Sequence, residues 1–219
     1  MSVDKTIPAV TLSQWQQLWH TLGAVNTFDS LNTLYNELIA RYNEDHRHYH
    51  TLYHLAECLK KFAELQDYAN KPAEIELALW FHDAIYEPNR NDNETLSAKW
   101  AYTSVLSAGL DDKIAEHVNK LIMVTQHQKL PVTMAEKILV DCDLAILAAA
   151  PQRFQEYEQQ IRKEYSFVSE HSFLTKRKAI LQHFLTRPSI FNTPHFIKHY
   201  EQNARSNLSQ ALKNYDISC

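Results

Sequence analysis

Histidine and aspartate side chains recur in this sequence at spacings that suit a metal-binding site. His50 and His54 are four residues apart, so on a helix both side chains point the same way, one turn above the other. The adjacent His82 and Asp83 end the apolar run LALWF, where an unpaired carboxylate would be costly. A carboxylate at that position needs a cation as its partner. The pattern therefore indicates an enzyme rather than a plain helical domain.

Two aspartates in the later segment LVDCDLAIL are further candidates for the same ion. We expect them on a helix that starts at Thr133 and stops near Pro151. On such a helix Asp141 and Asp143 project about 200° apart, because each residue advances by about 100°. They cannot both face one ion, and the apolar stripe of the segment does not decide between them. A mixed imidazole and carboxylate shell suits Zn, Mn, Fe or Ni and, with open positions, is typical of catalytic sites.

Composition and charge exclude several classes of function. The chain of 219 residues has 22 Lys and Arg against 26 Asp and Glu, so no broad basic face for nucleic acid is expected. Its two glycines are too few for a P-loop or a GxGxxG motif, so a bound phosphate would need metal, Arg, Lys or His instead. Three separated cysteines without CxxC favour neither disulfides nor a thiolate zinc site. With no secretion signal and no membrane-length apolar stretch, we expect a cytoplasmic protein that binds no membrane.

Apolar residues recur at helical spacing along nearly the whole chain. Together with few Gly and Pro and abundant Leu, Ala, Gln, Glu and Lys, this periodicity predicts an all-α fold. We expect one compact domain over residues 1–219, with a core over about 28–212 and a first helix over about 11–23. Pro72 is expected to open the helix that ends in the HD dipeptide. A last helix is expected to start at the cap Thr193.

The order of these residues resembles the HD-domain superfamily of metal-dependent phosphohydrolases, all-α proteins that cleave phosphate esters with one or two divalent metal ions. The similarity is closest to the bacterial branch described as predicted metal-dependent HD superfamily phosphohydrolases. It spans about residues 31–212 and is carried by RHYHTLYHL, ALWFHDAIYEP, NETLSA, LVDCDLAIL, IRKEYSFV and EQNARSNL. The resemblance implies a single HD-type helical domain.

Carried over residue by residue, the resemblance implies a divalent ion held by His54, His82 and Asp83. The ion could be Mn, Zn, Ni, Fe or Mg. The resemblance also favours Asp143 over Asp141 as the fourth ligand, because the second aspartate is the usual ligand in the family pattern D-A-D-x-L. Here Leu144 follows the pair directly, so the sequence departs from that pattern after the second aspartate.

The segment YHTLYH matches the YHxxxH motif of cyclic-nucleotide phosphodiesterases, distant members of the same superfamily. In that motif the first histidine is a general acid and the second binds metal. Since one helical turn rises about 5.4 Å, His50 can lie beside the ion without binding it and can protonate a leaving alkoxide. The alternative is that His50 only hydrogen-bonds a carboxylate near the ligands.

Three further residues are candidates for the site. Glu94 could orient or deprotonate a metal-bound water, although a Glu at a helix start also complements the helix dipole. Arg47 adjoins the histidine pair, and its guanidinium can bind a substrate phosphate through two hydrogen bonds. His127, at a helix end, could be a further ligand or a phosphate contact, or a solvated terminal histidine.

These residues lead us to expect a metal-dependent phosphohydrolase. Its substrate would be a phosphate ester of a nucleotide or of another small phosphorylated metabolite. One alternative is a di-iron HD-type oxygenase, for which His127 and a second aspartate could supply the additional ligands. Another is a non-catalytic, nucleotide-sensing HD module whose metal is structural. The number of metal ions and the oligomeric state are open at this point.

Overall fold

The computed structural model describes residues 10–25 and 28–217, which form helices joined by loops, with no β-strand among them. The α-helices of this part of the chain are Leu12–Leu22 (α1), Phe28–Tyr42 (α2), Leu52–Phe62 (α3), Pro72–Phe81 (α4), Asn93–Ser107 (α5), Asp112–Met123 (α6), Met134–Asp143 (α7), Pro151–Glu164 (α8), Glu170–Thr186 (α9), Pro194–His199 (α10) and Glu201–Ile217 (α11). Three short 3-10 helices lie between them, at Gln66–Tyr68 (η1), Val124–Gln126 (η2) and Leu144–Ala148 (η3). The predicted all-α fold is confirmed.

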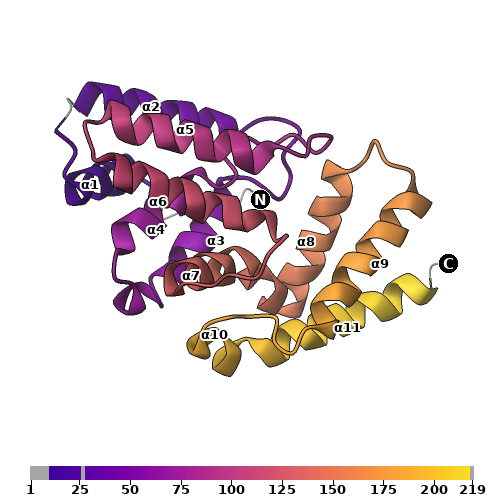
Figure 1. Ribbon diagram of the computed structural model, residues 1–219. Coiled ribbons are helices and arrows are strands. Elements are labelled where there is room, and N and C mark those ends of the chain that lie inside the picture. Colours follow the sequence, from indigo (N-terminus) through magenta and orange to yellow (C-terminus); the bar gives the residue numbers. More distant parts are fainter. Residues whose placement is uncertain (1–9, 26–27, 218–219) are drawn as a thin grey trace, which may run out of the picture.

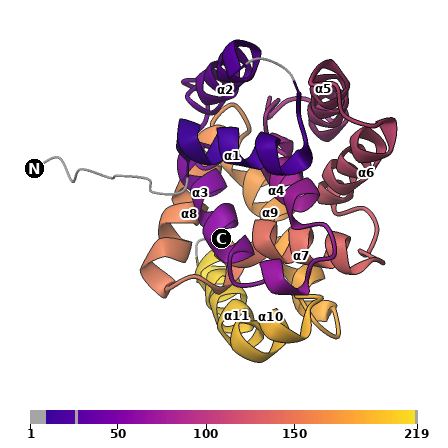
Figure 2. The ribbon, with the colours of Figure 1, turned by 90° about the vertical axis from the view of Figure 1, so that its left-hand side faces the viewer.

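Three helices in the middle of the molecule, α3, α4 and α7, contact one another (Figures 1 and 2). On one side α5 packs along α6, and α6 packs on α4. On the other side α8 and α9 lie next to α11, which runs beneath them and packs against η3. The central three helices carry the candidate metal ligands, so the surrounding helices determine how deeply the site is buried.

Buried apolar residues lie on every side of the helix α4. Ile75 and residues 77–81 are all 0 % exposed, as is typical of a helix enclosed by others rather than lying on a surface. Pro72 occupies its first turn, as predicted. Trp80 also packs against Trp15 of α1, with ring centroids 5.0 Å apart. Burial of this helix carries the HD dipeptide, which follows it directly, into the interior.

The helix boundaries agree with the prediction at α1, but α7 ends earlier than predicted and the last predicted helix is divided into α10 and α11. Thr11 caps α1 in a capping box, and Gly23 ends it in the left-handed region at φ 88°. In contrast, α7 ends at Asp143 and not near Pro151, because the chain tightens into η3, whose apolar side chains are buried. The expected last helix does begin at the cap Thr193 but is interrupted at residue 200, so that α10 and α11 are separate.

The interruption falls at Tyr200. Its backbone, at φ −125°, leaves the helical region. Its hydroxyl donates to Glu64 at 2.6 Å and accepts from Lys61 at 2.7 Å, contacts that fix the side chain beside the end of α3.

Within residues 10–25 and 28–217, no helix combines the length and the apolar composition that a membrane span requires.

Candidate metal centre

His54, His82 and Asp143 bring their side chains together between α3, α4 and α7. His54 Nε2 lies 3.2 Å from His82 Nε2 and 3.3 Å from Asp143 Oδ1, and His82 Nε2 lies 3.5 Å from the same oxygen. Together with Cys58 they form a group whose ligand atoms all lie within 4.8 Å of one another, the only such group of three or more in the part of the chain that the structure describes. This group could hold a metal ion.

Asp83 adds a second carboxylate to these donors. Its Oδ2 lies 3.0 Å from His82 Nε2 and 3.4 Å from His54 Nε2. Donor atoms that share one ion, with bonds of about 2.0–2.2 Å, must lie about 3–3.5 Å apart. The distances measured here fall in that range. The four side chains predicted as ligands therefore have the spacing of a coordination shell before any ion is considered.

The orientation of His82 leaves a lone pair facing the other donors. Its Nδ1 lies 2.8 Å from the carbonyl oxygen of Leu79, which is in the last turn of α4 and has no partner further along the helix. Nδ1 therefore carries the proton and donates it to this carbonyl. Nε2 is then unprotonated in the neutral ring, as a metal ligand must be.

Two buried oxygens beside the group lack a hydrogen-bond partner, Asp83 Oδ2 and the Tyr49 hydroxyl. The short contact between Asp83 Oδ2 and His82 Nε2 supplies none while that nitrogen holds a lone pair. The Tyr49 ring lies 4.7 Å from the ring of His54, between centroids. Leaving a buried polar atom unpaired costs about 1–3 kcal/mol. A cation among the donors would give Asp83 its missing partner, so these residues fit a metal ion.

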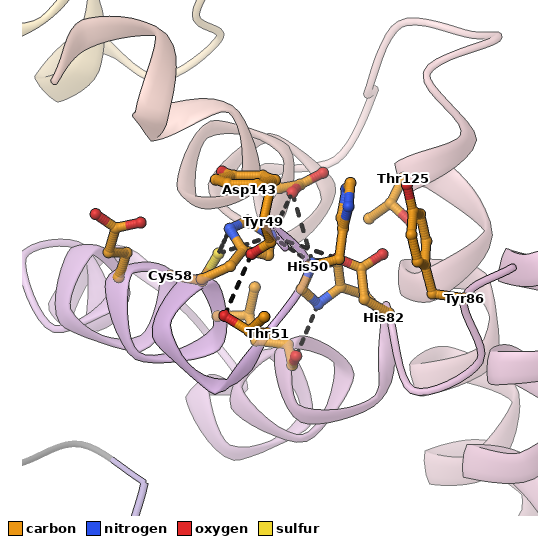
Figure 3. Close-up of polar contacts among 12 residues, drawn as sticks. Tyr49, His50, Thr51, Cys58, His82, Tyr86, Thr125 and Asp143 are labelled. Atoms are coloured by element: carbon orange, nitrogen blue, oxygen red, sulfur yellow. Dashed lines mark hydrogen bonds and ion pairs between the residues drawn. The ribbon is translucent and has the colours of Figure 1, made fainter. Parts of the chain in front are cut away.

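Cys58 is less suited than Asp83 to complete the shell. Its Sγ lies 3.6 Å from Nε2 and 3.7 Å from Nδ1 of His54. A sulfur nearly equidistant from both nitrogens lies alongside the ring, whereas an ion bound by Nε2 lies beyond that atom in the ring plane. Figure 3 shows Cys58 to one side of the centre, with His50, His82 and Asp143 between it and Tyr86. We therefore regard Cys58 as packing against His54.

The charges of the group are strongly coupled. Burial opposes the charged form of His82, yet the charge of Asp83 and the closeness of both carboxylates raise its pKa well above the usual value. Burial likewise opposes ionisation of Asp83 and Asp143, but the surrounding histidines hold both carboxyl pKa values well below the usual range. The carboxylates thus attract positive charge to this point, either as protons on the imidazoles or as a metal ion that displaces them.

Asp141 is placed away from this group. It is fully buried, and its Oδ1 accepts from the backbone and side-chain nitrogens of Asn192 at 2.8 and 2.9 Å. Its Oδ2 accepts from the backbone nitrogen and hydroxyl of Thr193 at 2.7 and 2.6 Å. These four bonds hold the residues that begin α10. The structure thus brings Asp143, and not Asp141, to the histidines.

His127 lies at the edge of the group. Its Nε2 is 3.0 Å from Asp143 Oδ2, while Oδ1 of the same carboxylate faces His54 and His82. Its backbone has φ 53°, in the left-handed region that residues other than glycine rarely adopt. The side chain is partly exposed. His127 therefore contacts the site through Asp143, and its roles as a further ligand or a phosphate contact stay predictions.

His50 precedes α3 instead of lying on it, contrary to the helical spacing expected for the histidine pair. The backbone of Thr51 is extended and its side chain caps α3, so the helix begins after it. The rings of His50 and His54 are nevertheless close, with centroids 5.8 Å apart. His50 Nδ1 lies 2.7 Å from Glu164 Oε2, and its ring stacks on Tyr86 with centroids 4.0 Å apart.

The guanidinium of Arg47 is hydrogen-bonded to other groups of the protein. Four of its five N–H groups are used, because the guanidinium donates to the Glu44 carboxylate and to the backbone carbonyls of His50, Asp83 and Ala84. It therefore ties the segment before α3 to the turn after α4. This placement gives Arg47 a structural task, and its binding of substrate phosphate stays a prediction.

Glu94 lies in the first turn of α5, where its charge complements the helix dipole as anticipated. It is absent from the group of close ligand atoms. After burial and the nearer Glu164, its charge is among the influences that raise the pKa of Tyr165 at the end of α8. A role for Glu94 toward a metal-bound water also stays a prediction.

Glu164 was not anticipated from the sequence. It follows its partner His50 by 114 residues, so no local spacing could connect the two. The segment IRKEYSFV, which contributes to the resemblance, contains it without marking it as functional. Tyr49 and Cys58 were visible only as an aromatic residue and a cysteine near the histidines.

No protein-family model, curated protein or solved structure matches this chain. The likeness to the HD-domain superfamily therefore stays a prediction from the sequence.

Proposed function

We propose that this protein is an HD-type, metal-dependent phosphohydrolase that cleaves a phosphate ester of a nucleotide or of another small phosphorylated metabolite. The observation that carries the proposal is the set of donor atoms from His54, His82, Asp83 and Asp143, in which each imidazole nitrogen lies 3.0–3.5 Å from the other imidazole and from both carboxylates. The set includes a buried carboxylate oxygen without a partner. A divalent ion held by these residues would give this oxygen a partner.

A divalent ion held there would lower the pKa of a bound water and polarise a phosphoryl oxygen. The chain contributes two imidazole lone pairs and two carboxylates, which together balance the charge of such an ion. The side chains of Asp83 and Asp143 are 17 % and 15 % exposed, whereas those of His54 and His82 are 2 % and 1 % exposed. Substrate would therefore approach from the carboxylate side.

His50 is the proton donor in this proposal. Its side chain is 20 % exposed, so a leaving group can reach it, in contrast to the buried ligands. Because Nδ1 is engaged by Glu164, Nε2 is the nitrogen left to pass a proton to the leaving oxygen. His127, which is also partly exposed and bonded to Asp143, is the second imidazole available to a phosphate.

The experiment that tests the function replaces the HD dipeptide. The double variant His82→Ala/Asp83→Ala should lose bound metal, measured by elemental analysis, and hydrolysis of a panel of nucleotides and phosphosugars offered with several divalent ions. The control is Glu170→Ala/His171→Ala, which removes an exposed acid–histidine pair from α9. Full hydrolytic activity in the His82/Asp83 variant would disprove the proposal.

One observation favours a second candidate, a di-iron HD-type oxygenase. Asp143 faces His54 and His82 with one oxygen and His127 with the other, the arrangement of a carboxylate that could bridge two ions. Two irons per chain and an oxygen-dependent reaction would support this candidate, whereas one non-iron ion with hydrolysis would exclude it. Tight nucleotide binding without turnover under any metal would instead indicate a nucleotide-sensing module.

A further inference from the structure

Glu164, the last residue of α8, binds two separate parts of the chain. Its Oε1 accepts hydrogen bonds from the backbone nitrogens of His48, Tyr49 and His50 at 2.8, 2.7 and 3.0 Å. Its Oε2 accepts from the Tyr86 hydroxyl at 2.9 Å and lies 2.7 Å from His50 Nδ1. The carboxylate is therefore fixed in position by the segment before α3 and by the turn after α4.

This carboxylate is ionised at neutral pH. Burial works against its charge, but His50 and the backbone hydrogen bonds lower the pKa of Glu164 to about 2. An ionised carboxylate only accepts hydrogen bonds, so the ring nitrogen that faces it must carry a proton. The proton of neutral His50 is then on Nδ1, and Nε2 gains a proton only when the ring becomes an imidazolium.

We propose that Glu164, assisted by Tyr86, is a positioning residue that sets the tautomer and the direction of the His50 ring. The inference rests on the proposed function, in which His50 protonates the leaving oxygen. The three backbone bonds keep the carboxylate in place, and Tyr86 both donates to it and stacks on the His50 ring at an interplanar angle of 26°. Tyr86 follows the HD dipeptide by three residues, so the same contact links the proton donor to the ligands.

Glu201 provides a matched control for Glu164, because it is a carboxylate with a purely structural role. Glu201 in α11 accepts hydrogen bonds from the backbone nitrogens of Ile190 and Phe191 at 3.0 and 3.1 Å and from the side-chain Nε of Arg205 at 2.7 Å. It is a carboxylate that holds a loop, as Glu164 does, but none of its bonds involves an imidazole. Glu201→Gln should therefore weaken stability without altering His50.

The experiment compares Glu164→Gln with Glu201→Gln on two kinds of phosphoester. A nitrophenyl ester has a leaving group that needs no proton, whereas an alkyl ester needs one. Glu164→Gln should lower kcat for the alkyl ester by about 100-fold, the scale of general acid catalysis. It should change kcat for the nitrophenyl ester, KM and metal content little. Equal losses of kcat on both esters, or no loss on either, would overturn the inference.

A second measurement needs no substrate. Nitrogen-15 NMR of the histidine rings should find the neutral Nδ1–H tautomer for His50 in the wild-type protein, assigned by comparison with His50→Gln. In Glu164→Gln the amide donates to Nδ1, so the Nε2–H tautomer should appear. An unchanged tautomer in this variant would disprove the positioning role. If wild-type protein hydrolyses no ester while the tautomer does switch, the proposed function fails and the control of His50 by Glu164 stands.

Discussion

Asp141 and Asp143 lie two residues apart on the same helix, yet their surroundings differ completely. Asp141 is fully buried and accepts four hydrogen bonds from the residues that begin α10. Asp143 is partly exposed and faces three imidazoles, those of His54 and His82 with one oxygen and that of His127 with the other. A carboxylate that the protein satisfies with N–H and O–H donors stabilises the fold, whereas one that faces imidazole lone pairs needs a cation. Glu164, like Asp141, is satisfied by N–H and O–H donors of the protein. Asp83, like Asp143, faces imidazoles.

The largest stability effect should come from Glu164. Its folded-state pKa is lowered from 4.5 to about 2, so its ionised form stabilises the protein at pH values above about 4.5, and this contribution is lost as the pH falls toward 2. Glu164→Gln should therefore lower the free energy of unfolding at pH 7 by up to about 3 kcal/mol, with a smaller difference at pH 3. Urea denaturation at both pH values measures this, with exposed Glu170→Gln as the control. A difference that is the same at both pH values would show that charge is not the cause.

Removing the charge of Asp141 should have a somewhat smaller effect on stability. Asp141→Asn loses acceptor capacity for the bonds that begin α10, so we expect it to destabilise the metal-free protein by about 1–3 kcal/mol. Asp143→Asn should cost less in the same measurement, because the only donors that this carboxylate faces are imidazoles, whereas Asp141 accepts four bonds from Asn192 and Thr193. Thermal or urea unfolding in the presence of a chelator compares the two. If Asp143→Asn is the more destabilising variant, the distinction between the two aspartates is wrong.

Substitution of Cys58 should have the smallest effect of these variants, and it is measured on metal affinity. The sulfur lies alongside the His54 ring and not at its Nε2 lone pair. Cys58→Ser should therefore leave metal affinity within about threefold of the wild-type value. Loss of a residue that supports a metal ligand would lower the affinity by about 10-fold or more. Cys142→Ser, at the other buried cysteine, is the matched control. The cobalt-substituted protein provides an independent check. A thiolate-to-cobalt charge-transfer band that disappears only in Cys58→Ser would instead establish Cys58 as a ligand.

The elements that carry the site could be predicted because their signals are local. Thr11 and Gly23 mark the ends of α1, and the apolar run after Pro72 produces α4 and buries the HD dipeptide behind it. The preference for Asp143 came from the resemblance, since the apolar stripe of α7 left both aspartates possible.

The remaining features depend on contacts between distant segments. The bonds of Glu164 to residues 48–50 connect parts of the chain that are more than 110 residues apart, and no periodicity records such a pairing. The break at Tyr200 similarly depends on Lys61 and Glu64 at the end of α3. The position of His50 outside α3 follows from Thr51, whose capping role competes with the helical spacing of the two histidines.

We propose that His54, His82, Asp83 and Asp143 hold a divalent ion. Titration of Zn²⁺ or Mn²⁺ into the wild-type protein and into Asp143→Asn and Asp141→Asn, each stripped of metal beforehand, tests this assignment. We expect binding to the wild-type protein, a loss of affinity of about 10-fold or more in Asp143→Asn, and nearly unchanged affinity in Asp141→Asn. No binding to the wild-type protein, or a larger loss in Asp141→Asn than in Asp143→Asn, would contradict the account.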